Sequence, residues 1–173
     1  MSQPEATNAE FARIRGYLQA QGTKLSPEQI IGKVQEAMGQ LRAAAAAVPA
    51  ARFTDPPAPG EWSANEVMAH VVDAGRHFGG AIVRVLDGQA PGQPRDAAAR
   101  DTSPRPLEEW WGLLERDRDA LFTRVRSVHP MARLEATIPH PFFGALNWRE
   151  TLLFMRLHDL DHAGQLQKVV AAF

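Results

Sequence analysis

Two histidines near the end of the chain have the spacing of metal ligands. His158 and His162 are four residues apart, so on a helix their rings share one face, with Cβ atoms about 6 Å apart. Two imidazoles at this spacing can hold one divalent ion. Met155 and Leu166 lie along the same face, which suggests that the pair faces a core. Histidines there need partners, because unpaired buried polar groups are costly.

A third histidine could complete this site from another helix. His70 repeats with Val67 and Val71 on one helical face, so it should point with them toward the core. A neighbouring helix that contributes one inward histidine is what a three-nitrogen site needs. The sequence therefore predicts a metal centre made of His70, His158 and His162.

Other polar residues on these helices could support the imidazoles. Glu66, Asp73 and Gln165 fall within one turn of a candidate ligand, where a side chain can hold an imidazole N–H. An ordinary surface role is the alternative for all three, and helix capping is the stronger interpretation for Glu66. Asp159 and Asp161 point about 100° away from the ligands, and we expect them to face solvent or another subunit.

The remaining histidines fit the site less well. His140 precedes the last helix within a proline-rich turn, from which it could reach the mouth of the site or simply serve the turn. His77 lies about 10 Å from His70 along the same face, too far to share an ion. It could line a pocket, but we expect it to be exposed. His129 closes a predicted helix, where a cation suits the negative helix end.

The composition excludes several kinds of chemistry. The 173 residues contain no cysteine, which rules out disulfides, iron–sulfur clusters, thiolate zinc sites and a cysteine nucleophile. The formal net charge of −1 gives no global basic footprint for nucleic acid or a membrane surface. No apolar stretch approaches the roughly 18 residues of a membrane span, and the first residues lack the build of a signal peptide. We therefore expect a cytoplasmic protein.

Proline-free windows predict the helices that position these residues. Four windows are long enough for five or more turns, and each carries apolar residues at helical spacing: 28–48, 60–90, 107–129 and 142–173. A weaker helical segment covers about 5–20. The one short candidate for a strand is 134–138. The chain is thus predicted to be all-α, a four-helix bundle in a single domain over 1–173, with an N-terminal extension (1–24) before the bundle (25–173).

Capping signals mark where the helices should start. Ser26, Ser63 and Asn147 each stand three residues before Gln or Glu, the pattern of a capping box. Ser103 is expected to open the third helix. Trp62 is expected to pack against Val67 across the second cap, as a hydrophobic staple.

The connections are long for a bundle. Residues 49–62, 87–103 and 128–146 each exceed the usual short helix–helix loop. The polar segment 87–103 could span the bundle from end to end, which would leave the second and third helices parallel. The expected order is then up-down-down-up.

At these residues the sequence resembles the DinB-like (YfiT-like) metalloenzyme superfamily. The resemblance lies in the order of its motifs, which span about 28–170: Pro59-Gly60-Glu61-Trp62-Ser63 leading to Glu66, His70 and Asp73, then Ile138-Pro139-His140-Pro141 and Gly144, then His158, His162, Gly164 and Gln165. The family implies an up-down-down-up four-helix bundle, commonly dimeric, with ligands at His70, His158 and His162. At Asp161 the chain departs from the family pattern, since many relatives have another histidine there.

The resemblance also implies a chemistry. Three neutral imidazoles leave the ion's charge largely uncompensated and keep positions open for a water or a thiol, whose pKa the ion lowers. Relatives include transferases and isomerases that use bacillithiol or mycothiol, and a chain without cysteine would need such a thiol from outside. Zinc or nickel suits the nitrogen site, manganese less so.

Three functions stay open on the sequence alone. The first is a metal-dependent S-transferase for a low-molecular-weight thiol, the second a metal-dependent hydrolase, and the third a non-catalytic, stress-related metal-binding or interaction bundle. We expect a small-molecule substrate and a homodimer. Four arginines could bind the carboxylates of an acidic thiol, although charged loop residues are usually only solvated: Arg84, Arg95, Arg100 and Arg105.

Overall fold

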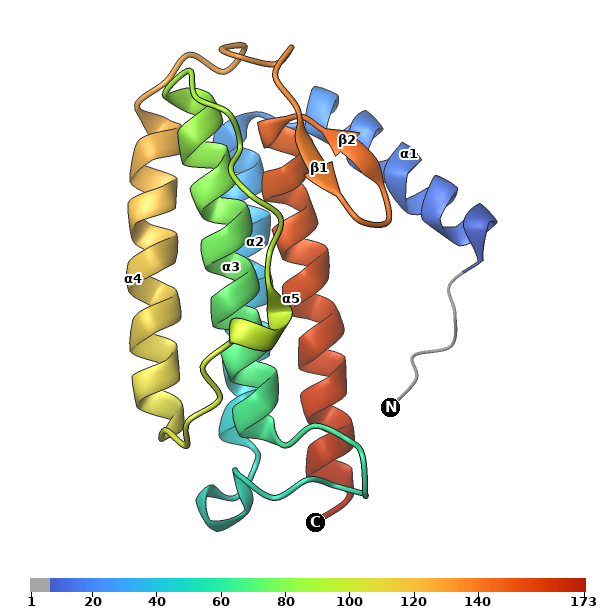
Figure 1. Cartoon of the computed structure of the whole chain (residues 1–173), viewed down its shortest axis with the longest axis vertical. Coiled ribbons are helices and arrows are strands. Elements are labelled where there is room, and N and C mark those ends of the chain that lie inside the picture. The colour runs from blue at the N-terminus through green and yellow to red at the C-terminus, as the bar shows by residue number, and fades with distance from the viewer. Residues whose placement is uncertain (1–6) are drawn as a thin grey trace.

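The computed structural model describes residues 7–173 and consists mainly of helices (Figure 1). Four long helices form the bundle: α2 (Pro27–Ala46), α3 (Ala64–Leu86), α4 (Leu107–Arg126) and α5 (Trp148–Ala171). The other elements are α1 (Asn8–Lys24), two short 3₁₀ turns, η1 (Ala50–Arg52) and η2 (Ala97–Ala99), and two strands, β1 (Ile138–His140) and β2 (Gly144–Leu146). The predicted four-helix bundle is confirmed.

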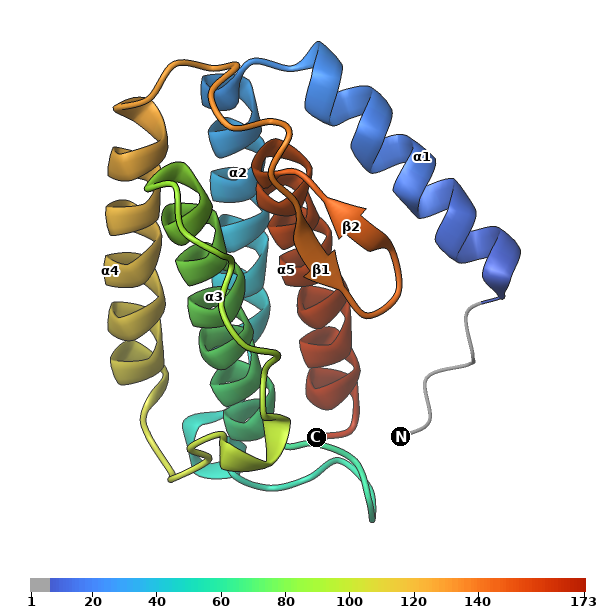
Figure 2. The same cartoon turned by 45° about the horizontal axis from the view of Figure 1, so that its top comes forward.

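The bundle has the expected up-down-down-up order. In Figure 1, α2 and α5 run downward, and α3 and α4 run upward. Each helix packs on two others, α2 and α3 each on α4 and α5, so α2 lies diagonally opposite α3. The parallel arrangement of α3 and α4 follows from their connection, residues 87–106, which returns along the outside of the bundle from the top of α3 to the base of α4 (Figures 1 and 2). We call this connection the crossover segment.

Three of the four predicted caps set the helix starts. Ser26, Ser63 and Asn147 each accept from the backbone N–H three residues later, and the Gln or Glu there bonds back to the cap. The expectation for Ser103 is wrong, because α4 starts at Leu107 after Pro106, without a side-chain cap. Two prolines, Pro104 and Pro106, keep the backbone extended up to that point.

A β-hairpin sits between α4 and α5, where the sequence suggested at most one strand over 134–138. Antiparallel β1 and β2 pair Ile138 with Leu146 and His140 with Gly144. Gly144 has φ +72°, a conformation that side chains rarely adopt, so glycine allows the turn. The strands have three residues each, too short for an alternating pattern to stand out in the sequence.

Helix α1 packs outside the bundle, against α5 (Figure 2). It runs further than the expected 5–20, to Lys24, and buries Leu18 completely. Residues 1–6 of the expected extension lie outside the described part of the chain. Within residues 7–173, no helix is both long and apolar enough to cross a membrane.

Candidate metal centre

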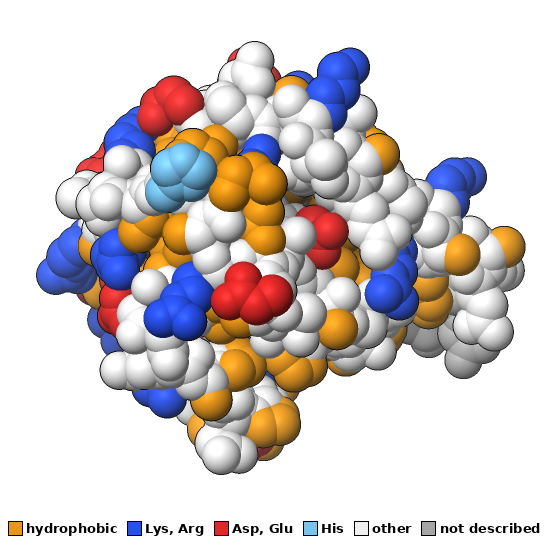
Figure 3. Space-filling model, turned by 90° about the horizontal axis from the view of Figure 1, so that it is seen from above, with side chains coloured by type: hydrophobic (Ala, Val, Ile, Leu, Met, Phe, Trp, Pro, Cys, Tyr) orange, Lys and Arg blue, Asp and Glu red, His pale blue; other side chains and the backbone are white. Residues whose placement is uncertain are grey.

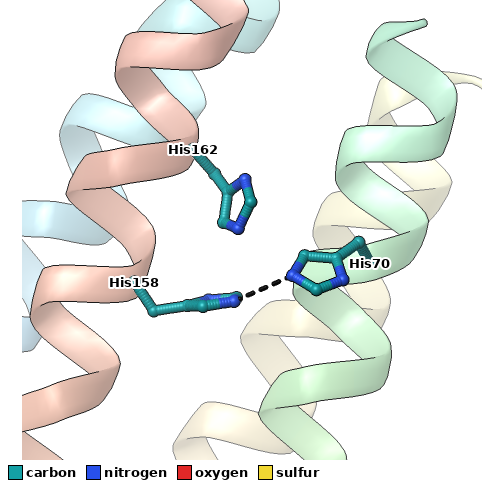
Figure 4. A group of neighbouring side chains, drawn as sticks. All are labelled: His70, His158 and His162. Carbon is teal, nitrogen blue, oxygen red and sulfur yellow. Dashed lines mark hydrogen bonds between the residues drawn. The ribbon is translucent and has the colours of Figure 1, made fainter. Parts of the chain in front are cut away.

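The structure brings His70 of α3 together with His158 and His162 of α5 (Figure 4). One ring nitrogen of each lies within 4.8 Å of the others. The ring centroids of His70 lie 5.0 Å from His158 and 4.6 Å from His162, and those of His158 and His162 lie 4.4 Å apart. Since α3 and α5 are antiparallel neighbours, His70 in the second turn of α3 meets His158 and His162 from the middle of α5. Their role as metal ligands stays a prediction.

Hydrogen bonds assign the protons on two of the rings. His162 donates its Nδ1–H to Oε1 of Gln165 over 2.8 Å, which leaves the Nε2 lone pair free. His70 Nδ1 faces guanidinium nitrogens of Arg95 at 3.5 Å and Arg100 at 3.4 Å. Guanidinium groups only donate, so this nitrogen accepts, and His70 Nε2–H donates to His158 Nε2 over 3.0 Å.

All three histidines are held neutral at pH 7, the form that binds metals. Burial, helped by the charges of His162, Arg95 and Arg100, lowers the pKa of His70 from its usual 6.5 to about 3. Burial is also the main cause that lowers the pKa of His158 well below 6.5. It lowers the pKa of His162 as well, against the bond to Gln165, which acts in the opposite direction.

The donor set fits a divalent transition ion. Two nitrogen ligands of one tetrahedral ion lie about 3.3 Å apart, which follows from metal–nitrogen distances of about 2.0–2.1 Å. The Nε2 atoms of His70 and His158 are 3.0 Å apart, so an ion could replace the proton between them. Three neutral nitrogen donors suit zinc or nickel better than the hard ions that prefer oxygen.

Aromatic rings and the crossover segment close the site. The Trp62 ring lies 5.1 Å from that of His70, and the Phe154 ring lies 5.8 Å from that of His158. Arg100 stacks over Trp62 at 4.8 Å from the ring centroid. Trp62, which we expected only to staple a helix cap, is thus part of the site's wall.

The supporting residues have distinct places. Gln165 bonds a candidate ligand directly, as described above. Asp73 pairs with Arg95 over 2.9 Å, and that arginine in turn faces His70. Glu66 is used by the capping box, where its carboxylate accepts from the Ser63 backbone and hydroxyl.

One aromatic ring, that of Phe154, lies between His140 and His158 of the candidate centre. It is buried, and its ring packs against Phe143 and Phe154. Its Nδ1 accepts the backbone N–H groups of Phe142 and Phe143, which fixes the turn of the hairpin. Of the two alternatives for His140, the structure shows the turn contact directly.

Asp159 corrects an expectation. It is completely buried and forms a bidentate ion pair with Arg118 of α4, with distances of 2.8 and 2.9 Å. Helical spacing correctly predicted that its side chain points away from the ligands. That side of α5 faces the interior of the bundle rather than solvent, and Arg118 reaches it from the diagonally opposite α4. Asp161 is exposed, as expected. His77 is half-buried rather than exposed.

The sequence named Arg95 and Arg100 only among four arginines that could bind carboxylates. It did not connect them to the histidines, and it did not single out Arg118 of α4. Arg95 and Arg100 lie in a segment without periodicity, and Arg118 falls among several charged residues of its helix. One signal was available for Arg118, since its position repeats with Leu114, Leu121 and Val125 on the buried face of α4.

Comparisons with known proteins agree with this architecture. The chain superposes on TT2238, a four-helix bundle protein, with a TM-score of 0.63 and 25% identity, over 82% of this chain and 98% of that one. It superposes on YfiT from Bacillus subtilis with a TM-score of 0.64 and 18% identity, over 82% of this chain and 87% of that one. YfiT is described as a probable metal-dependent hydrolase with an unusual four-helix bundle topology. No curated protein matches the chain.

The model of the DinB superfamily matches residues 33–166. This range holds α3, α4, the hairpin and all three clustered histidines, together with most of α2 and α5. The chain belongs to the DinB superfamily.

Proposed function

We propose that this protein is a metal-dependent enzyme whose three histidines hold a divalent ion, and that it transfers a low-molecular-weight thiol such as bacillithiol or mycothiol. The observation that carries the metal proposal is the convergence of three neutral imidazoles within 4.8 Å. The absence of cysteine supports an external thiol, because the chain has no thiol of its own. A bound ion would lower the pKa of a coordinated thiol or water and so supply a nucleophile near neutral pH.

The chain's own residues would prepare the site for this chemistry. Gln165 holds the proton of His162 on Nδ1, so that Nε2 is free to bind. Trp62 and Phe154 flank the histidines and restrict the entry of water. Arg95 and Arg100 add positive charge beside His70, which favours an anionic nucleophile or substrate.

Hydrolysis is the second candidate, favoured by the description of YfiT. The two candidates differ only in the nucleophile, a thiolate or a hydroxide, and the same three histidines would serve both. A non-catalytic metal-binding role is the third. An assay that supplies the thiol and the electrophile separately distinguishes the first two.

Metal analysis of protein purified without a histidine tag tests the site. We expect about one equivalent of zinc or nickel after reconstitution, lost in His158→Ala and retained in His129→Asn, which changes an exposed histidine outside the cluster. Less than about a tenth of an equivalent of any transition metal in the wild type would refute the metal site.

Turnover tests the reaction. The reconstituted protein should conjugate bacillithiol or mycothiol to an electrophile, and His158→Ala should abolish this while His129→Asn does not. Hydrolysis of ester or amide substrates without any thiol would favour the second candidate. A protein that binds the metal and performs neither reaction would support the non-catalytic role.

A further inference from the structure

Two arginines of the crossover segment converge on the candidate centre from outside the bundle. Arg95 and Arg100 flank η2 and reach back to α3, where both approach the same atom, Nδ1 of His70, at 3.5 and 3.4 Å. Both side chains are partly buried. Their convergence means that the segment does more than connect α3 to α4.

These two guanidinium groups have more hydrogen-bond donors than acceptors around them, since Asp73 pairs with Arg95 alone. The Nδ1 atom has one lone pair, so it cannot satisfy two donors. Among residues 7–173, Arg100 forms no ion pair, and its buried Nε has no hydrogen-bond partner. An ion on Nε2 of His70 would leave the ring's remaining proton on Nδ1, and both arginines would then lose this acceptor as well.

The local charge is also unbalanced. Arg95 and Arg100 bring two positive charges to His70, and Asp73, paired with Arg95, brings one negative charge. A divalent ion beside them would add two more positive charges. The pair of Arg95 with Asp73, at 2.9 Å, shows that a carboxylate can be held at this place.

The geometry points to a substrate that carries a carboxylate, bound by Arg95 and Arg100 next to the three-histidine centre. This inference rests on the proposed function, because it names the substrate class of the same site. The planar guanidinium fork matches a carboxylate with two parallel hydrogen bonds. Stacking over Trp62 holds the Arg100 guanidinium in place, which lowers the entropy lost on binding.

Binding of a small carboxylate to the full chain tests the inference. The probes are succinate and its uncharged counterpart succinamide, titrated into the metal-free protein and followed by backbone amide NMR shifts. We expect succinate to bind and succinamide not to bind. Arg100→Gln should weaken succinate binding about tenfold, as expected for a lost charge-assisted hydrogen bond, and Arg95→Gln should act in the same direction.

Arg105→Gln is the matched control. Arg105 belongs to the same segment and stacks on Trp110 at 5.0 Å, as Arg100 stacks on Trp62, but it pairs with Asp101 and not with the histidines. Its variant should bind succinate within about twofold of the wild type. Equal binding by wild type and Arg100→Gln, or an equal loss in Arg105→Gln, would overturn the inference, as would the absence of succinate binding to the wild type.

The outcome separates this inference from the proposed function. The protein could take up one metal ion and conjugate the thiol, but bind succinate independently of Arg95 and Arg100. That result would contradict only the inference that these two arginines bind a carboxylate, the carboxylate anchor. A protein that binds succinate through these arginines but takes up no metal supports the anchor and contradicts the metal-dependent reaction.

Discussion

At the scale of single residues, Gln165 decides which nitrogen of His162 is free to bind a metal. Its amide oxygen accepts the Nδ1–H over 2.8 Å. We predict that Gln165→Leu weakens zinc affinity about 10- to 100-fold, because the ring loses the partner that fixes its proton and orientation. Competition with a chromophoric chelator measures this.

Gln165→Glu is the matched variant, since its carboxylate can accept the same proton. It should keep the zinc affinity within a few-fold of the wild type or strengthen it. If Leu and Glu at this position weaken the affinity equally, the hydrogen bond is not what prepares His162.

The buried pair of Arg118 and Asp159 is a second feature of single residues, and it concerns stability. The side chains are 2% and 0% exposed and bond through both guanidinium nitrogens that face the carboxylate. We predict that Asp159→Asn lowers the free energy of unfolding by about 3–5 kcal/mol, because Arg118 is left as an uncompensated buried charge. Urea denaturation of the metal-free protein measures it.

The double variant Arg118→Met/Asp159→Leu separates this effect from simple repacking. It removes both charges and should recover most of the lost stability. A double variant that is less stable than Asp159→Asn would contradict the explanation, and would mean that packing at these positions matters more than charge.

The candidate site could be predicted from the sequence only where helices carry it. His70, His158 and His162 fall at helical spacings, so their common direction follows from the period of the helix. Arg95 and Arg100 could not be placed, because a long irregular segment has no period that says which residues point inward. Asp159 was misplaced for a different reason, since spacing on one helix does not show which of its sides face the interior of the bundle.

At the scale of elements, one buried side chain anchors the crossover segment to the bundle. Asn65 of α3 donates to the Thr102 carbonyl and accepts from the Arg105 backbone N–H and the Trp110 indole N–H. We predict that Asn65→Leu lowers the free energy of unfolding by about 3 kcal/mol, because it leaves buried donors unpaired. The segment should also open more often, and trypsin should cut it after Arg95 and Arg100 faster than in the wild type.

A double-mutant cycle with Trp110→Phe tests whether unpaired donors cause this loss of stability. In that background the indole donor is gone, so Asn65→Leu should cost less stability than in the wild type. Equal costs in the two backgrounds, with unchanged cleavage of the segment, would contradict the anchoring role.

Elements differ in how well local sequence specifies them. The capping boxes at Ser26, Ser63 and Asn147 are local motifs of four residues, and they predicted three helix starts correctly. The hairpin depends on Gly144 and on packing against α3, which a three-residue strand does not show in its own sequence. The parallel order of α3 and α4 could be predicted because the length of their connection limits where it can run.

At the scale of the whole molecule, the overall charge does little to attract an anionic substrate to the site. The formal net charge is −1, and Figure 3 shows charged side chains of both signs interspersed with apolar ones over the upper end of the molecule. Long-range attraction of an anion is therefore weak, and salt screens it further. Selection of an anionic substrate depends on the two arginines at close range.

Acid should destabilise the whole fold, because its buried histidines resist protonation. Burial, with a contribution from the charge of His77, lowers the pKa of His140 from 6.5 to about 4. Between these values the unfolded chain binds a proton that the folded chain does not, so stability is complete above pH 6.5 and falls as the pH drops toward 4. His140 alone accounts for about 3 kcal/mol of this loss.

The variant His140→Asn tests how much of the stability lost in acid comes from His140. The Asn oxygen can accept the backbone N–H groups of Phe142 and Phe143 in place of Nδ1, but it does not titrate. In metal-free protein, the free energy of unfolding measured by urea denaturation at several pH values should fall less steeply below pH 6.5 in this variant than in the wild type. His129→Asn, at an exposed position, should leave the slope unchanged. Identical slopes for His140→Asn and the wild type would mean that His140 gains its proton without opening the core, and that the acid sensitivity comes from the three clustered histidines alone.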